Sequence, residues 1–186
     1  MKRISAVCIL FFLFLTGCAK SQDRIDRCME LRSQLLRSSC RFAVEITADY
    51  GDQLHTFTLQ CTGNPEGDLT FAVVQPQSIA GITGNITGKG GFLTFDDVAL
   101  HFDLLADDTV TPVSAPWILL RTLQGGYLTS AGEEDGLLRV TIDDSYEEDA
   151  LQLDVWLDGQ NIPVRGEILY DGRRILSLTV TDFIIE

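Results

Sequence analysis

Hydrophobic and polar residues alternate along most of this chain from about residue 40 onward, which is the pattern of β-strands with one buried face. The clearest run begins with Cys40, Phe42 and Val44, which place apolar side chains at every second position. Glycine-rich or acidic segments separate successive runs, as turns do. The pattern predicts strands over residues 40–49, 55–61, 69–75, 82–86, 92–95, 98–104, 127–130, 138–142, 151–157, 162–170 and 173–185.

Helical spacing of apolar residues occurs in two segments. The first covers residues 23–37, and the side chains expected to face a core there are Ile25, Cys28, Met29, Arg32, Leu35 and Leu36. The second runs from Ser114, a good N-cap residue, to Gln124. Its expected inward-facing residues are Trp117, Leu120 and Leu123. This order of elements predicts a mainly β (α+β) fold, with one antiparallel sheet and helices packed against it.

The first two strands are expected to form a hairpin with a two-residue turn at Tyr50-Gly51. In that register the numbers of paired residues sum to 101, and every pair keeps both members on one face of the sheet. Hairpin turns are also expected at Asp158-Gly159 and Asp171-Gly172. The predicted pairs are Cys40 with Cys61, Phe42 with Leu59, Val44 with Phe57, and Ile46 with His55.

Cys40 and Cys61 lie opposite each other in this register, so we expect a disulfide between them. A bridge closing a loop of about 20 residues would stabilise the fold by about 3 kcal/mol in the loop-entropy model. Two buried thiols are the alternative, and Cys28 competes as a partner for either residue. The cysteines lack CxxC spacing and the chain has two histidines, so no metal site is expected.

The first residues are expected to form a cleaved leader. Met1-Lys2-Arg3 is positive, residues 4–15 are almost wholly apolar, and Leu15-Thr16-Gly17-Cys18 follows. The apolar run is shorter than the roughly 20 residues of a membrane span and is typical of a secretory signal. Its last four residues resemble the lipobox of bacterial lipoproteins. That resemblance implies removal of residues 1–17 and lipidation of Cys18.

The mature chain is then expected to consist of a short tether, residues 18–22, and a single domain, residues 23–186. It would be exported and held by lipid at the extracytoplasmic face of a bacterial membrane, where disulfides can form. The leader holds two of the 14 Lys and Arg residues and none of the 27 Asp and Glu residues, so the mature chain carries a formal charge of −15. This acidity argues against nucleic acid as a partner.

An N-terminal helix, a long run of antiparallel strands, a short central helix and more strands follow one another over most of the mature chain. This order resembles the lipoprotein-carrier superfamily, that is, LolA- and LolB-like half-barrels, and the local strand and turn pattern agrees with it. A strand from Asp68 runs to Pro76, a turn follows at Ile79-Ala80-Gly81, and residues 90–95 form a glycine turn and strand. The resemblance implies a curved sheet or half-barrel, with an N-terminal and a short central helix packed on it. It also implies an apolar cavity for acyl chains, with candidate lining residues Phe42, Val44, Phe57, Leu59, Phe71, Phe102 and Trp117.

Two functions are compatible with these features. The first is a lipid-anchored lipoprotein that binds an acyl chain or another apolar ligand, such as the acyl chain of a lipoprotein, in the concave sheet. The second is an envelope interaction or scaffold module with a filled core and an unknown protein partner. An enzyme is not expected, because a GxSxG elbow is absent and no catalytic residues or cofactor motif emerge. His55 and His101 are expected to be structural, and the acidic residues 143–149 lack the spacing of an EF-hand.

Overall fold

The structure of the protein is a computed structural model that describes residues 22–49, 54–96, 98–102, 105–106, 109–147 and 150–186. The leader, the expected cleavage site and Cys18 lie outside the described residues, as does the predicted Tyr50-Gly51 turn.

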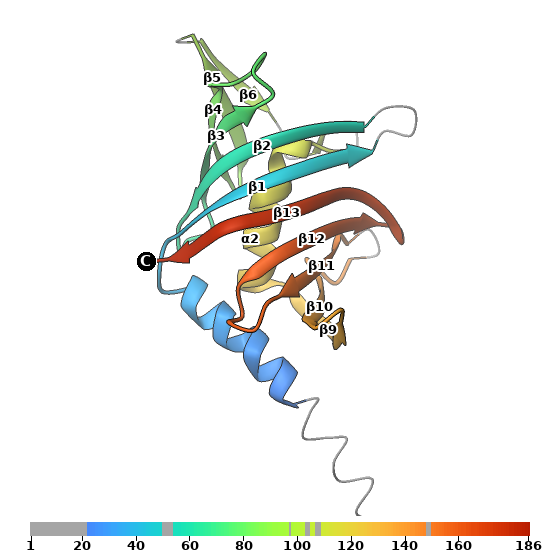
Figure 1. Cartoon of the computed structure of the whole chain (residues 1–186). Coiled ribbons are helices and arrows are strands. Elements are labelled where there is room, and N and C mark those ends of the chain that lie inside the picture. Colours follow the sequence, from blue (N-terminus) through green and yellow to red (C-terminus); the bar gives the residue numbers. More distant parts are fainter. Residues whose placement is uncertain (1–21, 50–53, 97, 103–104, 107–108, 148–149) are drawn as a thin grey trace, which may run out of the picture.

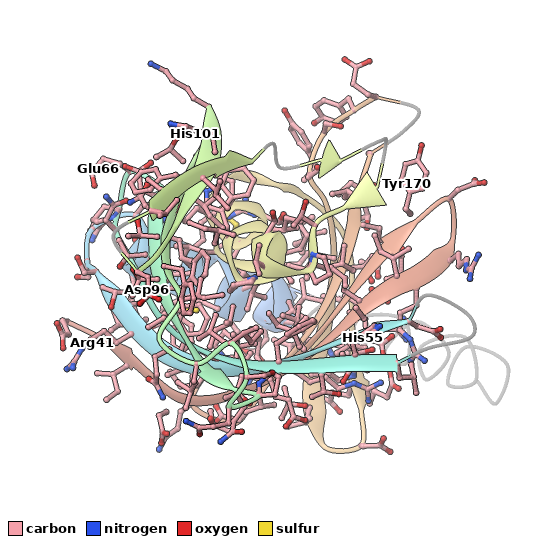
Figure 2. The ribbon with its side chains drawn as sticks, turned by 90° about the horizontal axis from the view of Figure 1, so that it is seen from above. Arg41, His55, Glu66, Asp96, His101 and Tyr170 are labelled. Atoms are coloured by element: carbon pink, nitrogen blue, oxygen red, sulfur yellow. The ribbon has the colours of Figure 1, made fainter. Side chains whose placement is uncertain are left out.

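Eleven strands form one antiparallel sheet in the order β6-β5-β4-β3-β2-β1-β13-β12-β11-β10-β9. The sheet curves around the helix α2, which Figures 1 and 2 show from the side and from above. This arrangement confirms the predicted curved antiparallel sheet with packed helices. The strands are β1 (Cys40–Asp49), β2 (Leu54–Gly63), β3 (Leu69–Gln75), β4 (Thr83–Thr87), β5 (Gly90–Phe95), β6 (Val98–Phe102), β9 (Tyr127–Glu134), β10 (Leu137–Asp143), β11 (Gln152–Leu157), β12 (Pro163–Tyr170) and β13 (Arg173–Ile185).

The chain follows a simple path through this sheet. It starts in the middle at β1 and runs outward, strand by strand, to the edge at β6. A small separate pair, β7 (Leu105–Ala106) and β8 (Thr109–Val110), follows, and α2 (Ala115–Gly125) then leads to the other edge at β9. From there the chain returns to the middle, where β13 pairs with β1. Below, the inner face is the side of the sheet packed by helices, and the outer face is the opposite side.

The N-terminal helix is described over residues 22–35, close to the predicted segment. Its buried side chains are Cys28, Leu31 and Leu35, each at most 1% exposed. Two of the predicted core residues are wrong, because Met29 is 45% and Leu36 50% exposed. The helix is rotated toward Leu31, and this orientation lets Arg32 reach the end of α2.

The central helix begins close to where the sequence predicts it. A 3₁₀ turn, Pro112–Ser114, precedes α2. Ser114 occupies the N-cap position of α2, as predicted, but its backbone is helical and its side chain makes no capping hydrogen bond. Leu120 and Leu123 are buried as expected, while Trp117 is half-buried. Ile118 and Leu119 are also buried and complete the face that packs on the sheet.

The first hairpin has a different register from the predicted one. Asp49 pairs with Leu54, so residue numbers sum to 103 rather than 101. Residues 50–53, between these partners, lie outside the described structure. A shift by two residues keeps each side chain on its face, because the side-chain period of a strand is two. The pairs observed are Cys40 with Gly63, Phe42 with Cys61, Val44 with Leu59, Ile46 with Phe57, and Ala48 with His55.

The two predicted hairpin turns differ in length. At Asp171-Gly172 both residues have positive φ, 49° and 70°, between the paired residues Tyr170 and Arg173. This is the backbone of a type I′ turn, as predicted. The hairpin turn predicted at Asp158-Gly159 is present but longer than two residues, because Leu157 pairs with Pro163 and the N–H of Asn161 donates to the carbonyl of Asp158 at 3.1 Å. Asp158 Oδ1 also accepts hydrogen bonds from the backbone N–H groups of residues 160 and 162, at 2.8 and 2.9 Å.

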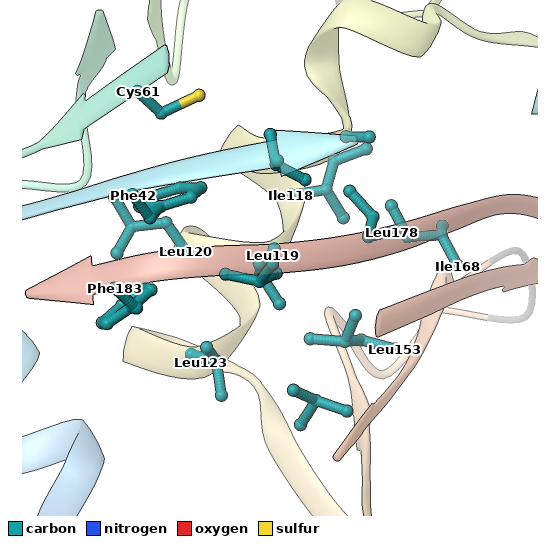
Figure 3. Close-up of a cluster of buried hydrophobic side chains, with 14 of the residues drawn as sticks. Phe42, Cys61, Ile118, Leu119, Leu120, Leu123, Leu153, Ile168, Leu178 and Phe183 are labelled. Atoms are coloured by element: carbon teal, nitrogen blue, oxygen red, sulfur yellow. The ribbon is translucent and has the colours of Figure 1, made fainter. Parts of the chain in front are cut away.

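One continuous core lies between the inner face and the two helices. Side chains of α2 meet those of strands from both halves of the sheet (Figure 3). The rings of Phe42 and Phe183 stack with centroids 5.2 Å apart, so the core includes the seam between β1 and β13. Packing is tight beneath the helix, since a Cβ at Gly63 would lie 2.3 Å from Leu120 Cδ2.

Candidate ligand-binding surfaces

The predicted cavity residues lie mainly inside the core. Phe42, Val44, Leu59 and Phe71 are 0–4% exposed on the inner face. Phe57 is half-buried on the same face. The four buried residues therefore belong to the packed core.

The other two candidates have different positions. Trp117 is half-buried and its indole N–H donates a hydrogen bond to the carbonyl of Gly67, at 2.8 Å. This contact ties α2 to the turn between β2 and β3. Phe102 belongs to β6, and its side chain lies outside the described part of the structure.

The inner face extends beyond the helices at its β5–β6 edge. Gly84 of β4 pairs with Leu93 of β5, which in turn pairs with Leu100 of β6, so the three residues lie on the same face of the sheet. A Cβ at Gly84 would lie 2.5 Å from the ring of Phe71, a buried residue of the inner face. Leu93 and Leu100 therefore belong to the inner face, and strand alternation adds the paired Phe95 and Val98.

This extension exposes large apolar side chains. Phe95 is 49%, Val98 59% and Leu100 63% exposed, whereas Leu93 is half-buried and contacts the core. We call Leu93, Phe95, Val98 and Leu100 the inner strip. Exposed apolar residues that are contiguous in this way mark interaction sites more often than isolated ones do. The predicted candidate list missed the strip, although the alternation in residues 92–95 and 98–104 was the available signal.

The cysteines are three free, buried thiols among the described residues: Cys28, Cys40 and Cys61. The predicted direct pairing of Cys40 with Cys61 is wrong, because Cys40 lies opposite Gly63 and Cys61 opposite Phe42. Burial raises the pKa of Cys40 to about 11. Burial, and then the neighbouring Cys40, raises the pKa of Cys61 still further. Burial therefore favours the protonated form of both thiols near neutral pH.

The histidines and acidic residues do not form a catalytic or metal site within the described residues. His55 and His101 are both exposed, and His55 was expected on the buried face beside Ile46. Its partner is Ala48, nearer the end of the hairpin. No group of three or more His, Cys, Asp or Glu residues in the described ranges could hold a metal ion. No helix in those ranges is long and apolar enough to cross a membrane.

The outer face of β10–β12 carries a polar cluster around Trp156. The guanidinium carbons of Arg139 and Arg165 lie 5.2 and 4.2 Å from the centre of the indole ring, which explains why Trp156 is only 3% exposed. Asp154 is 2% exposed and accepts hydrogen bonds from Arg139 and Thr141, each 2.6 Å long. Asp154 raises the pKa of Arg139 through this bond. These contacts cross-link β10, β11 and β12, although Arg139 Nε is buried without a hydrogen-bond partner in the described residues.

Comparison with solved structures identifies the fold. A LolA superfamily protein from Nitrosomonas europaea matches with a TM-score of 0.50 and 11% identity, over 89% of this chain and 93% of that one. An uncharacterized conserved protein from Thermus thermophilus gives 0.48 and 13%, over 90% and 88%. The lipoprotein LppX of Mycobacterium tuberculosis gives 0.41 and 16%, over 87% and 93%. The match to the LolA superfamily protein shows that the chain has a LolA-like fold. No protein-family model matches the sequence, and no curated protein matches it either.

Proposed function

We propose that this protein is an exported lipoprotein, anchored through lipid on Cys18, that binds an acyl chain or a similar apolar ligand at the inner strip. The observation that carries the ligand proposal is the exposure of Phe95, Val98 and Leu100, 49–63%, on the face of the sheet that otherwise forms the core. The leader residues 1–18 support export and anchoring.

The strip suits an extended apolar ligand because it continues the core without a polar boundary. Leu93 contacts the core at one end, and Val98 and Phe95 pair at the other. Fully burying one side chain such as Leu100 contributes about 1.5–3 kcal/mol. In this proposal the inner strip holds its ligand by apolar contact alone, because its four side chains include no nucleophile and no acid–base pair.

A carboxylate within the strip is expected to weaken binding of an apolar fluorescent dye by 10-fold or more. Leu100→Asp places a charge where the ligand would remove water, so binding loses the Leu100 contribution and must desolvate the carboxylate. The measurement is dye titration of the purified chain, with native mass spectrometry for co-purified lipid. Leu54→Asp is the matched control, because Leu54 is 69% exposed on a strand whose alternation places it on the outer face.

Equal dye affinity in Leu100→Asp and the wild-type chain would contradict the strip as the binding site. Absence of both dye uptake and bound lipid in the wild-type chain would favour the interaction or scaffold module instead. That result would agree with a filled core, which is tightly packed where Gly63 meets Leu120 under α2.

The anchor is tested by fatty-acid labelling in cells. Cys18→Ala is expected to reduce incorporation of labelled fatty acid to background, because Cys18 supplies the sulfur to which the lipid is attached. Cys8→Ala changes a cysteine inside the apolar run and is expected to leave labelling unchanged. Intact mass of the wild-type protein should show a chain that begins at Cys18. A labelled Cys18→Ala protein would contradict this anchor.

A further inference from the structure

The outer face carries a straight row of side chains across neighbouring strands of the N-terminal half of the sheet. Each member is the cross-strand partner of the next, from β1 to β5. Their chain neighbours, among them Phe42 and Phe71, are buried, so the row points away from the helices. Figure 2 shows Arg41 on the outside of the curved sheet. We call these residues the outer row: Arg41, Thr62, Thr70, Asn85 and Phe92.

The outer row lines an open pocket of about 740 Å³. A second row, one step along the strands, lines the same pocket with Gln60, Ala72, Thr83 and Thr94. A smaller pocket of about 260 Å³ adjoins it and shares Asn85 and Phe92. Because neighbouring strands are about 4.8 Å apart, the groove spans about 19 Å from Arg41 to Phe92.

A β-bulge completes the groove at its β13 end. Between Arg41 and Ala43 the register against β13 shifts, because Ile184 and Thr181 are their respective partners. The bulge residue Asp182 has a φ of +53°, and both Asp182 and Ile184 line the pocket. Bulges commonly redirect side chains in this way beside functional sites.

The polar groups of the groove are available to a ligand. The side chains of Gln60, Thr83, Asn85 and Thr94 form no hydrogen bond within the described structure. Hydroxyl and amide side chains each both donate and accept hydrogen bonds, as sugar hydroxyls do. Phe92 adds an aromatic ring that is 42% exposed, and such a ring packs against the C–H face of a sugar.

We propose that this groove binds a linear oligosaccharide of low charge. Charge argues against an anionic polymer, because Arg41 is already paired with Glu186 and Asp182 adds a negative charge. An acyl chain would leave the polar rows unsatisfied. A peptide strand would be expected at a sheet edge, where backbone groups are free, whereas this groove crosses strands that are paired on both sides. The proposal is independent of the inner strip.

The β5 strand provides a matched pair of test residues. Phe92 and Phe95 are similarly exposed, 42% and 49%, but lie on opposite faces of the same strand. The probes are chitotetraose and maltotetraose, titrated into the purified chain and followed by chemical-shift changes and calorimetry. We expect one or both to bind the wild-type chain, with a loss of at least 10-fold in Phe92→Ala and no change in Phe95→Ala.

Dye binding should show the reverse pattern, since Phe95 belongs to the inner strip and Phe92 does not. Asn85→Ala provides a second outer-row variant and should also weaken sugar binding. Failure of both sugars to bind the wild-type chain at millimolar concentration would overturn the proposal, as would equal losses in Phe92→Ala and Phe95→Ala. Neither outcome affects the dye experiment, so the two binding surfaces are judged separately.

Discussion

Gly126→Ala is expected to destabilise the protein by about 2–3 kcal/mol, as insertion of a methyl group into a filled space does. A Cβ at Gly126 would lie 2.6 Å from Ile142 Cγ2 and 2.8 Å from the backbone oxygens of both Thr122 and Asp143. Two of these three atoms belong to the backbone, so relief requires moving α2 against the sheet. The measurement is the free energy of unfolding from urea denaturation.

Gly125→Ala is the control for this steric effect. Gly125 is exposed at the end of α2, and a Cβ there meets no atom within 4 Å. Alanine is also the better helix residue, so the free energy of unfolding should stay equal or rise slightly. Gly126 has φ of −71° and ψ of 170°, which alanine adopts readily. Equal stabilities for the two variants would contradict the close packing at the end of α2.

Arg32→Met is expected to lower the free energy of unfolding by about 2–3 kcal/mol, since it removes two charge-assisted hydrogen bonds. Arg32 Nε donates to the carbonyl of Leu123 at 2.7 Å, and Nη2 donates to that of Gly126 at 2.8 Å. These carbonyls end α2, where a cation also interacts favourably with the helix dipole. Methionine keeps most of the aliphatic length and leaves the carbonyls without this donor.

Arg37→Met is the control for loss of a positive charge, because Arg37 lies in the turn that follows the N-terminal helix, which carries Arg32. Arg37 is exposed and its side chain has no hydrogen bond or ion pair in the described structure, so its change should cost at most about 0.5 kcal/mol. The free energy of unfolding of Arg32→Lys should lie between those of Arg32→Met and Arg37→Met, because lysine keeps the charge but cannot donate to both carbonyls in the geometry of a guanidinium group. Amide exchange in the last turn of α2 gives a second measurement, and unchanged protection in Arg32→Met would contradict the capping role.

The alternation of side chains predicted the strands well because burial acts on every second residue. It could not choose between pairing registers that differ by two residues, since both place Phe42 and Val44 on the inner face. That choice depends on the turn, and Tyr50-Gly51 is a weaker signal than Asp171-Gly172, which the structure confirms. The same limit explains why Cys40 and Cys61 were placed directly opposite each other.

The two candidate surfaces were hidden from sequence for a related reason. The outer row joins five residues from five strands, and it exists only when the registers of four successive strand pairs are known together. The inner strip depends on where the helices stop covering the sheet. The position of the N-terminal helix on the sheet depends on side-chain contacts. Arg32 holds this helix to α2 by two hydrogen bonds, and Leu31 is buried. The apolar pattern alone also allowed Met29 and Leu36 to face inward.

The pairing of β1 with β13 determines how this sheet can assemble. Every other neighbouring pair in the eleven-stranded sheet joins strands that follow one another in the chain. Two meanders, β1 to β6 and β9 to β13, can therefore form from local contacts alone, which favours rapid association. The single long-range pairing joins them when Arg173–Ile185 meets Cys40–Asp49. Each half presents a bare strand edge until then, so the last thirteen-residue strand protects the chain against pairing with the wrong neighbour.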